Sequence, residues 1–165
     1  MYIFDILREE HENIRKFTDK FELMAIDLME KNNISFEAYA EAIEFIRTYA
    51  DKTHHQKEEK ILFKAMLETK DEMANNLINH GMIVEHNLAR LYVWELESAL
   101  KQYKQEQNIK TKLAIIANTM SYVYLLRRHI DKENNAVYPY GQRLLDKEII
   151  DKLNKEAKEY SILEK

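Results

Sequence analysis

The chain has 165 residues, and its 25 basic and 29 acidic side chains give a formal net charge of −4. Two glycines and one proline leave few places for β-turns, and the absence of cysteine excludes disulfides, thiolate metal sites and cysteine catalysis. The charges are interspersed and no apolar run reaches the roughly 20 residues of a membrane span, so neither nucleic acid nor a membrane is an expected partner. We expect one all-α domain over residues 1–165, located in the cytoplasm because no signal-peptide pattern is visible.

The first helix is predicted over about Ile3–Lys31, where the residues of one face recur every three or four positions. That face reads Phe4, Leu7, His11, Ile14, Phe17, Phe21, Met24 and Leu28. His11 stands where an aliphatic residue is expected, so a polar side chain is predicted inside the core.

The second helix is predicted over about Phe36–Leu67, with Ser35 as its N-cap and Glu37 in its first turn. Its inward face reads Tyr39, Ile43, Ile46, Ala50, His54, Glu58, Ile61 and Ala65. His54 and Glu58 are four residues apart and therefore share one side of the helix, where they interrupt an apolar stripe.

The third helix is predicted over Lys70 to about Gln105, after a capping-box pattern with Thr69 as N-cap and Glu72 as N3. Its inward face reads Asn75, Asn79, Met82, His86, Ala89, Val93, Leu96 and Leu100. Gly81 costs up to about 1 kcal/mol relative to Ala in a helix, which we interpret as a sign that another helix approaches closely. Trp94 and the methionines are interpreted as core residues.

The fourth helix begins near Ile109, and its inward face carries Ile115, Asn118, Tyr122, Leu125, His129, Glu133 and Ala136. Pro139 is expected to end or kink this helix, and a shorter helix follows over about residues 146–161. Short turns between long helices predict an up-down-up-down four-helix bundle over about residues 3–145, with a short C-terminal helix.

Each long helix places one histidine on its apolar face, and two helices add a glutamate one turn later. These six residues are His11, His54, Glu58, His86, His129 and Glu133. Taken singly, each histidine is more often a core residue bonded to a carbonyl, and each glutamate a solvent-exposed partner in an i,i+4 pair. Burying all six in one core without partners would cost several kcal/mol for each unpaired charge, which is hard to tolerate in a domain whose net stability is about 5–15 kcal/mol. Metal ions satisfy all six at once, so the pattern predicts a two-metal carboxylate site.

Four segments resemble those of the hemerythrin-like, His-His-Glu cation-binding proteins, which hold a non-haem di-iron centre among four antiparallel helices. The segments are Arg8–His11, His54–Phe63, Glu85–Asn87 and His129–Asn134, the last followed by Tyr138 and Pro139. The resemblance covers about residues 3–145. The second and fourth segments are specific in order and spacing, whereas the first and third each match through a single histidine.

The resemblance implies a centre of two iron ions. By this resemblance His54 and His129 would be terminal ligands, and Glu58 and Glu133 would bridge the two irons. His11 and His86 would complete the coordination shells. Oxygen-carrying hemerythrins supply a second histidine in the third helix where this chain has Met82, and a thioether is a poor ligand for iron, which predicts an open coordination position. Their last motif ends in aspartate where this chain has Asn134, so Glu133 is expected to serve instead.

Four further residues are placed near these positions. His55 and Glu59 each follow a predicted ligand by one residue and are offset from it by about 100°. We interpret them as supporting or solvent-facing side chains, unless the register is shifted by one residue. His80 lies off the inward face and is expected at the surface. Tyr122 either lines the ligand pocket or packs in the core with a bonded hydroxyl.

We expect a protein that binds or reacts with dioxygen, nitric oxide or peroxide at the two irons. The set of four histidines and two glutamates also resembles di-iron proteins implicated in repairing or supplying iron centres, so iron handling, iron-centre repair or sensing of oxygen or iron is the alternative. An enzyme that reduces peroxide or nitric oxide with an external donor and a metal-free structural bundle stay open too. A protein redox partner is compatible with any of the iron-binding functions, and the same donors also suit manganese or zinc.

Overall fold

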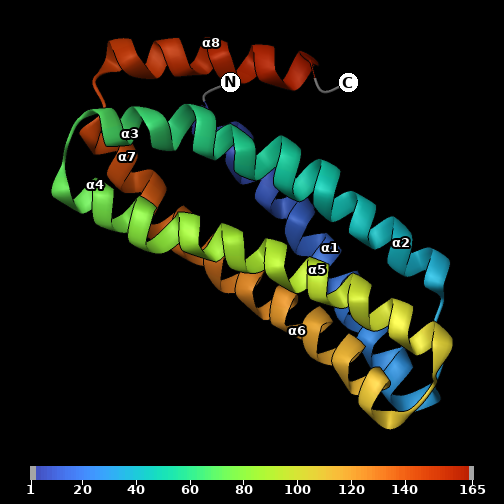
Figure 1. The fold of residues 1–165 in the computed structure, drawn as a ribbon. Coiled ribbons are helices and arrows are strands. Elements are labelled where there is room, and N and C mark those ends of the chain that lie inside the picture. The colour runs from blue at the N-terminus through green and yellow to red at the C-terminus, as the bar shows by residue number, and fades with distance from the viewer. Residues whose placement is uncertain (1–2, 164–165) are drawn as a thin grey trace.

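The computed structural model describes residues 3–163, and every regular element in that range is helical, which confirms the all-α prediction (Figure 1). Residues 1–2 and 164–165 of the predicted domain lie outside the described range. The first long stretch is α1 (Ile3–Lys31), and the second joins α2 (Phe36–Phe45), η1 (Ile46–His55), η2 (Glu58–Phe63) and α3 (Lys64–Glu68), where η marks a π-helical segment.

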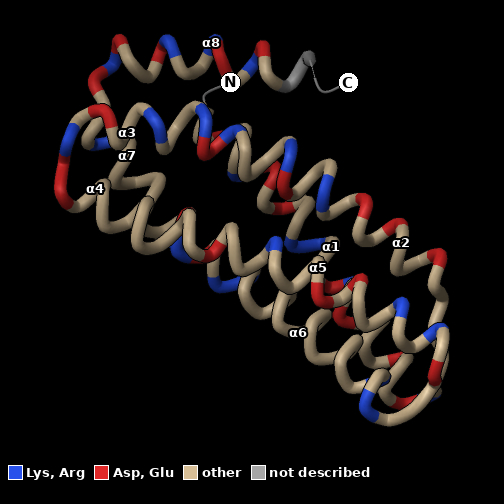
Figure 2. The backbone as a smooth tube through the Cα atoms, in the orientation of Figure 1, with Lys and Arg blue, Asp and Glu red and all other residues tan. Residues whose placement is uncertain are grey.

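The third stretch joins α4 (Glu72–Leu77), η3 (Ile78–Met82) and α5 (Ile83–Gln105). The fourth joins α6 (Ile109–Lys132), η4 (Glu133–Val137) and α7 (Tyr138–Leu144), and α8 (Lys147–Leu163) follows. Figure 1 shows the four stretches side by side and α8 lying across one end; α8 packs against α1 and η2. Acidic and basic residues are interspersed along the chain, α8 included (Figure 2). No helix within 3–163 is long and apolar enough to cross a membrane.

The helix starts follow capping chemistry, with one correction. Ser35 is the N-cap of α2, and its hydroxyl accepts a hydrogen bond from the backbone amide three residues later. The prediction that Thr69 caps the third stretch is wrong, because α4 begins at Glu72 with Asp71 as its N-cap. Lys70 has a φ of 59°, so the chain turns through the left-handed region between Thr69 and Asp71.

Pro139 does not end the fourth stretch, which continues to Leu144. Pro139 lies in the first turn of α7, and the residue before that turn, Val137, keeps a helical backbone conformation, so the stretch runs on although Pro139 has no backbone N–H to donate. The preceding segment, η4, has wider i→i+5 turns. The proline therefore coincides with a change in helix type.

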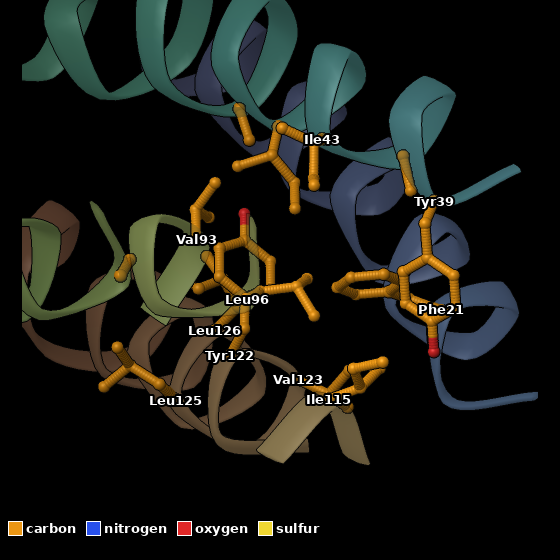
Figure 3. Close-up of a cluster of buried hydrophobic side chains, with 14 of the residues drawn as sticks. Phe21, Tyr39, Ile43, Val93, Leu96, Ile115, Tyr122, Val123, Leu125 and Leu126 are labelled. Carbon is orange, nitrogen blue, oxygen red and sulfur yellow. The ribbon is translucent and has the colours of Figure 1, made fainter. Parts of the chain in front are cut away.

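The apolar core consists of two clusters. The distal cluster lies toward the turns that follow α1 and α5, and its larger members are Ile14, Phe21, Leu28, Tyr39, Ile43, Val93, Leu96, Tyr103, Ile115 and Tyr122 (Figure 3). The α8-side cluster includes Ile3, Phe4, Leu7, Leu62, Phe63, Met66, Ile78, Met82, Tyr138 and Leu153. Along each long stretch the two clusters are separated by what we call the polar layer: His11, His54, His55, Glu58, His86, His129 and Glu133.

Three side chains interpreted as core residues are exposed. Trp94 is 62% exposed, and Met29 and Met73 are more than half exposed. Helical periodicity places a residue on a face, but it does not show how wide the buried part of that face is. The core interpretation of Trp94 and of these two methionines is therefore wrong.

The inward face of the third stretch also differs from the prediction. Its buried positions at the start are Ala74 and Ile78, whereas Asn75 and Asn79 are exposed. Gly81 has no closely approaching helix, because a Cβ built on it meets only a backbone oxygen of its own stretch, at 3.8 Å. The interpretation of this glycine as a close-approach site is wrong.

Candidate metal centre

All six predicted site residues meet in the polar layer, and each is almost fully buried. Among the described residues their donor atoms form two groups within which all atoms lie no more than 4.8 Å apart. The first group is His11, His54, Glu58 and Glu133; the second is Glu58, His86, His129 and Glu133. Both groups contain both glutamates, which is the arrangement that two neighbouring cations with shared carboxylates require.

A ring of hydrogen bonds orients the four histidines. Each donates from Nδ1 to an oxygen on a neighbouring stretch, and the pairs are His54 to Glu10 (3.0 Å), His86 to Glu59 (2.7 Å), His129 to Glu85 (2.9 Å) and His11 to Asn134 (3.0 Å). Carboxylate and amide oxygens can only accept, so the hydrogen must be on Nδ1. In the neutral ring Nε2 therefore presents a free lone pair, which is the tautomer that binds metal.

Basic side chains bond the three carboxylates of this ring. Lys57, which is fully buried, bonds Glu10; Arg90 bonds Glu59 at 2.8 Å; Lys132 bonds Glu85. Burial raises the pKa of Glu59, but hydrogen bonds from His86 and Arg90 outweigh it and lower the pKa overall. The hydrogen bond from His129 lowers the pKa of Glu85. Glu59 and Glu85 thus stay charged behind their histidines.

The Nε2 atoms face the two shared glutamates. The distances are His11 to Glu133 (3.1 Å), His129 to Glu133 (3.2 Å), His54 to Glu58 (3.6 Å) and His86 to Glu58 (3.4 Å). Each glutamate therefore spans one histidine of each group. Within residues 3–163, His54 Nε2 and Glu58 Oε2 have no hydrogen-bond partner, and the two Glu133 oxygens have none besides these contacts to His11 and His129. Buried polar atoms are rarely left so, and cations would satisfy them all.

The charges in the layer are coupled. Burial and the nearby Glu133 raise the pKa of Glu58. Burial also disfavours ionised Glu133, but His129 and His11 outweigh it and hold its pKa well below the usual range. Burial disfavours charged His129, yet Glu133 raises its pKa to about 10. Glu133 and the two histidines His11 and His129 therefore favour each other's charged forms, whereas the surroundings of Glu58 disfavour its ionised form.

His55 belongs to the polar layer, so the solvent-facing interpretation is wrong, while a supporting role and a register shifted by one residue both stay open. It is only 2% exposed, its ring stacks on His86 with centroids 3.9 Å apart, and its donor atom groups with those of His86 and His129. The two consecutive histidines, His54 and His55, are both buried at the end of the π-helical η1, where α-helical spacing does not apply. Burial lowers the pKa of His55 to about 4. The consecutive pair His54-His55 is the signal in the sequence that could indicate a role for His55.

Tyr138 is a second residue to which sequence reasoning gave no role. It is fully buried, stacks on His11 and donates its hydroxyl hydrogen to Glu58. The same hydroxyl lies 3.3 Å from His11 Nε2. Burial raises the pKa of this phenol well above its ordinary value, so it keeps its proton beside the shared carboxylate.

The remaining candidates are placed as follows. Met82 is buried within the α8-side cluster. His80 is exposed, as predicted, and Glu59 is part-buried in the supporting position described above. Tyr122 is buried in the distal cluster, and its hydroxyl has no hydrogen-bond partner among the described residues, so the alternative of a core tyrosine with a bonded hydroxyl is wrong.

The helical bundle and the two linked His/Glu groups define a candidate cation-binding protein. The family model described as the hemerythrin HHE cation binding domain matches residues 2–141, and the chain belongs to that family. A comparison with curated proteins finds no match. The family and the donor groups together indicate cation binding at the polar layer.

Proposed function

We propose that this chain is a non-haem di-iron protein that binds or reacts with dioxygen, nitric oxide or peroxide at a carboxylate-bridged site. The observation that carries the proposal is the membership of Glu58 and Glu133 in both donor groups. His11 and His54 would hold one iron, and His86 and His129 the other. An up-down-up-down order of the long stretches within a single domain is the architecture expected to unite these residues.

His55 makes the two groups unequal. As a further ligand on the side of His86 and His129, it would give that side three histidines against two on the other. Coordination positions for an exogenous ligand are then expected beside His11 and His54. This revises the expectation of an open position opposite Met82, because Met82 packs among apolar side chains.

Two ferrous ions, when bound, supply the electrons and the coordination positions that such ligands need. The protein's own contribution is to hold the histidines in one tautomer through the ring of Glu10, Glu59, Glu85 and Asn134. The apolar clusters exclude water from the two ends of the layer. Tyr138 keeps a proton next to Glu58 and could donate a hydrogen bond to an oxygen atom arriving on the His11 side.

The test is anaerobic reconstitution of the chelated protein with ferrous iron, followed by iron analysis and exposure to oxygen, nitric oxide or peroxide. We expect two irons per chain and a ligand-dependent visible absorption. Glu58→Gln and Glu133→Gln should lose iron, whereas His80→Ala, which alters an exposed histidine, should not. Failure to bind iron would contradict the di-iron assignment; iron binding without any spectral response would contradict the reactivity.

A sensing or iron-handling role, including iron-centre repair, is the second candidate, and the buried charges of the layer favour it. Without metal, unpaired polar atoms remain in the core, so metal occupancy must change the stability of the fold. A partner that binds only the metal-free or only the metal-loaded form would support this role. Steady-state consumption of peroxide or nitric oxide with an electron donor would instead indicate an enzyme.

A further inference from the structure

A cavity of about 220 Å³ lies beside the polar layer, between the second stretch and α5. Its lining runs from buried His55 and Tyr122 to the exposed side chains of Arg47 and Trp94. Ala89 and Val93 of α5 contribute apolar wall. The cavity therefore connects the surface with the face of the layer on which His55 lies.

The buried part of this cavity contains polar atoms without partners. Tyr122 is 1% exposed, and its hydroxyl has no hydrogen-bond partner within residues 3–163. His55 Nε2 has none either, and His55 Nδ1 has only a 3.5 Å contact with Asp51 Oδ1. Figure 3 shows the Tyr122 ring extending from α6 across the bundle, with its hydroxyl oxygen near Val93 and Ile43. Burial raises the pKa of this phenol, so it offers a neutral O–H group.

The two arginines of the lining are already neutralised. Arg47 makes two hydrogen bonds to the Glu97 carboxylate, one of them 2.9 Å long. Arg90 bonds both Asp51 (2.7 Å) and Glu59 (2.8 Å). An anionic ligand would have to compete with these carboxylates, so the cavity favours an uncharged molecule.

We propose that this cavity binds a small neutral aromatic alcohol of the phenol class, with its ring against Ala89 and Val93 and its oxygen at Tyr122 and His55. The size agrees, since an apolar cavity of about 150 Å³ binds benzene, and the larger volume leaves room for a polar substituent. In the metal-free protein, one hydroxyl can accept a hydrogen bond from Tyr122 and donate one to a single ring nitrogen of His55. The bound ring would contact His55, which stacks on His86, so occupancy is coupled to the metal layer without filling it.

Trp94 is the chain's only tryptophan and lies at the cavity, so its fluorescence reports on binding. Metal-free full-length protein is titrated with phenol and, separately, with benzoate, and calorimetry provides a measurement independent of Trp94. We expect saturable phenol binding and much weaker benzoate binding. Tyr122→Phe should weaken phenol binding about tenfold, the size expected for one buried hydrogen bond. The control Tyr124→Phe, which alters a half-exposed tyrosine of the same helix, should bind as wild type.

Ala89→Leu should abolish phenol binding by filling the cavity. If that variant does not fold, the phenol affinity of Tyr122→Phe still tests the proposal. No saturable binding by either method, equal binding by Tyr122→Phe, or stronger binding of benzoate would overturn the proposal. In iron-loaded protein, phenol should shift the visible absorption, and an unchanged spectrum at saturating phenol would overturn the coupling through His55. Because binding is measured on metal-free protein, its failure is distinct from failure of the proposed iron function.

Discussion

The polar layer and the distal cluster use the same helices in different ways. The distal cluster is built from aromatic and aliphatic side chains on mostly α-helical turns. Around the layer the helices change type: η1 ends at His55, η2 begins at Glu58, η3 ends one turn before His86, and η4 begins at Glu133. Of the four described stretches that reach the layer, α1 alone does so without a π-helical segment. Wide turns thus occur where side chains must converge on one place, as π-bulges often do at functional sites.

Metal removal should separate the two regions most strongly. A cation that binds only the folded state stabilises it by about 4 kcal/mol per site at a free concentration a thousandfold above Kd, or roughly 10 °C in Tm for a chain of this size. We expect chelation to lower Tm at least this far. Hydrogen exchange should accelerate around the layer before it does in the distal cluster. Equal acceleration of hydrogen exchange in both regions would show that the polar layer and the distal cluster do not differ in their dependence on metal.

Phe21→Ala tests the distal cluster. Phe21 is fully buried there, and its truncation should cost about 3–5 kcal/mol through lost burial and a residual cavity. Because the site is remote from the layer, the loss should be the same with and without metal. Denaturant unfolding of both forms measures it, and a loss that depends on metal would show that the two regions are not independent.

The shared glutamates should differ in metal-free protein. Glu133→Gln removes the charge that pairs with His11 and His129 and should cost about 3 kcal/mol. Glu58→Gln should cost less, because burial and the nearby Glu133 raise the pKa of Glu58 and so already disfavour the charge that this substitution removes. Both variants should lose iron. Urea unfolding at neutral pH gives the comparison; below the pKa that Glu133 has in the folded protein, its contribution is lost and the two variants should converge.

Tyr138→Phe removes one hydrogen bond to Glu58 while keeping the stacked ring. We expect a loss of about 1 kcal/mol, retained iron and an altered visible spectrum. Tyr140→Phe serves as a matched control, because its hydroxyl bonds Asp71, away from the layer. A spectrum unaffected by Tyr138→Phe would place that hydroxyl outside the influence of the metals.

Gly81→Ala should have the smallest effect, and a stabilising one. Gly81 lies in η3 with negative φ, and an added Cβ has only an ordinary contact at 3.8 Å. Alanine then gains about 0.5–1 kcal/mol from its lower unfolded-state entropy. Thermal unfolding measures the gain; a loss instead would mean that the π-helical segment needs glycine.

The sequence predicts the bundle and most of the layer, because a periodicity of three to four residues fixes which side of an α-helix faces inward. It fails where that period changes. An α-helical rotation per residue places His55 about 100° from His54, whereas η1 is π-helical and both side chains are buried. The roles of Tyr138 and Glu10 depend on contacts between distant stretches, which local spacing does not contain. Trp94 lies at the rim of a cavity, which no periodicity describes.

The ring of hydrogen bonds around the layer contains one uncharged member. Asn134 gives His11 an amide oxygen, whereas the other three histidines face carboxylates. An imidazole that donates to a carboxylate is the more basic ligand. If the layer holds the two proposed irons, we expect its two halves to differ in affinity even before His55 is counted. They should then fill in order: the half with His86 and His129 first, the half with His11 last.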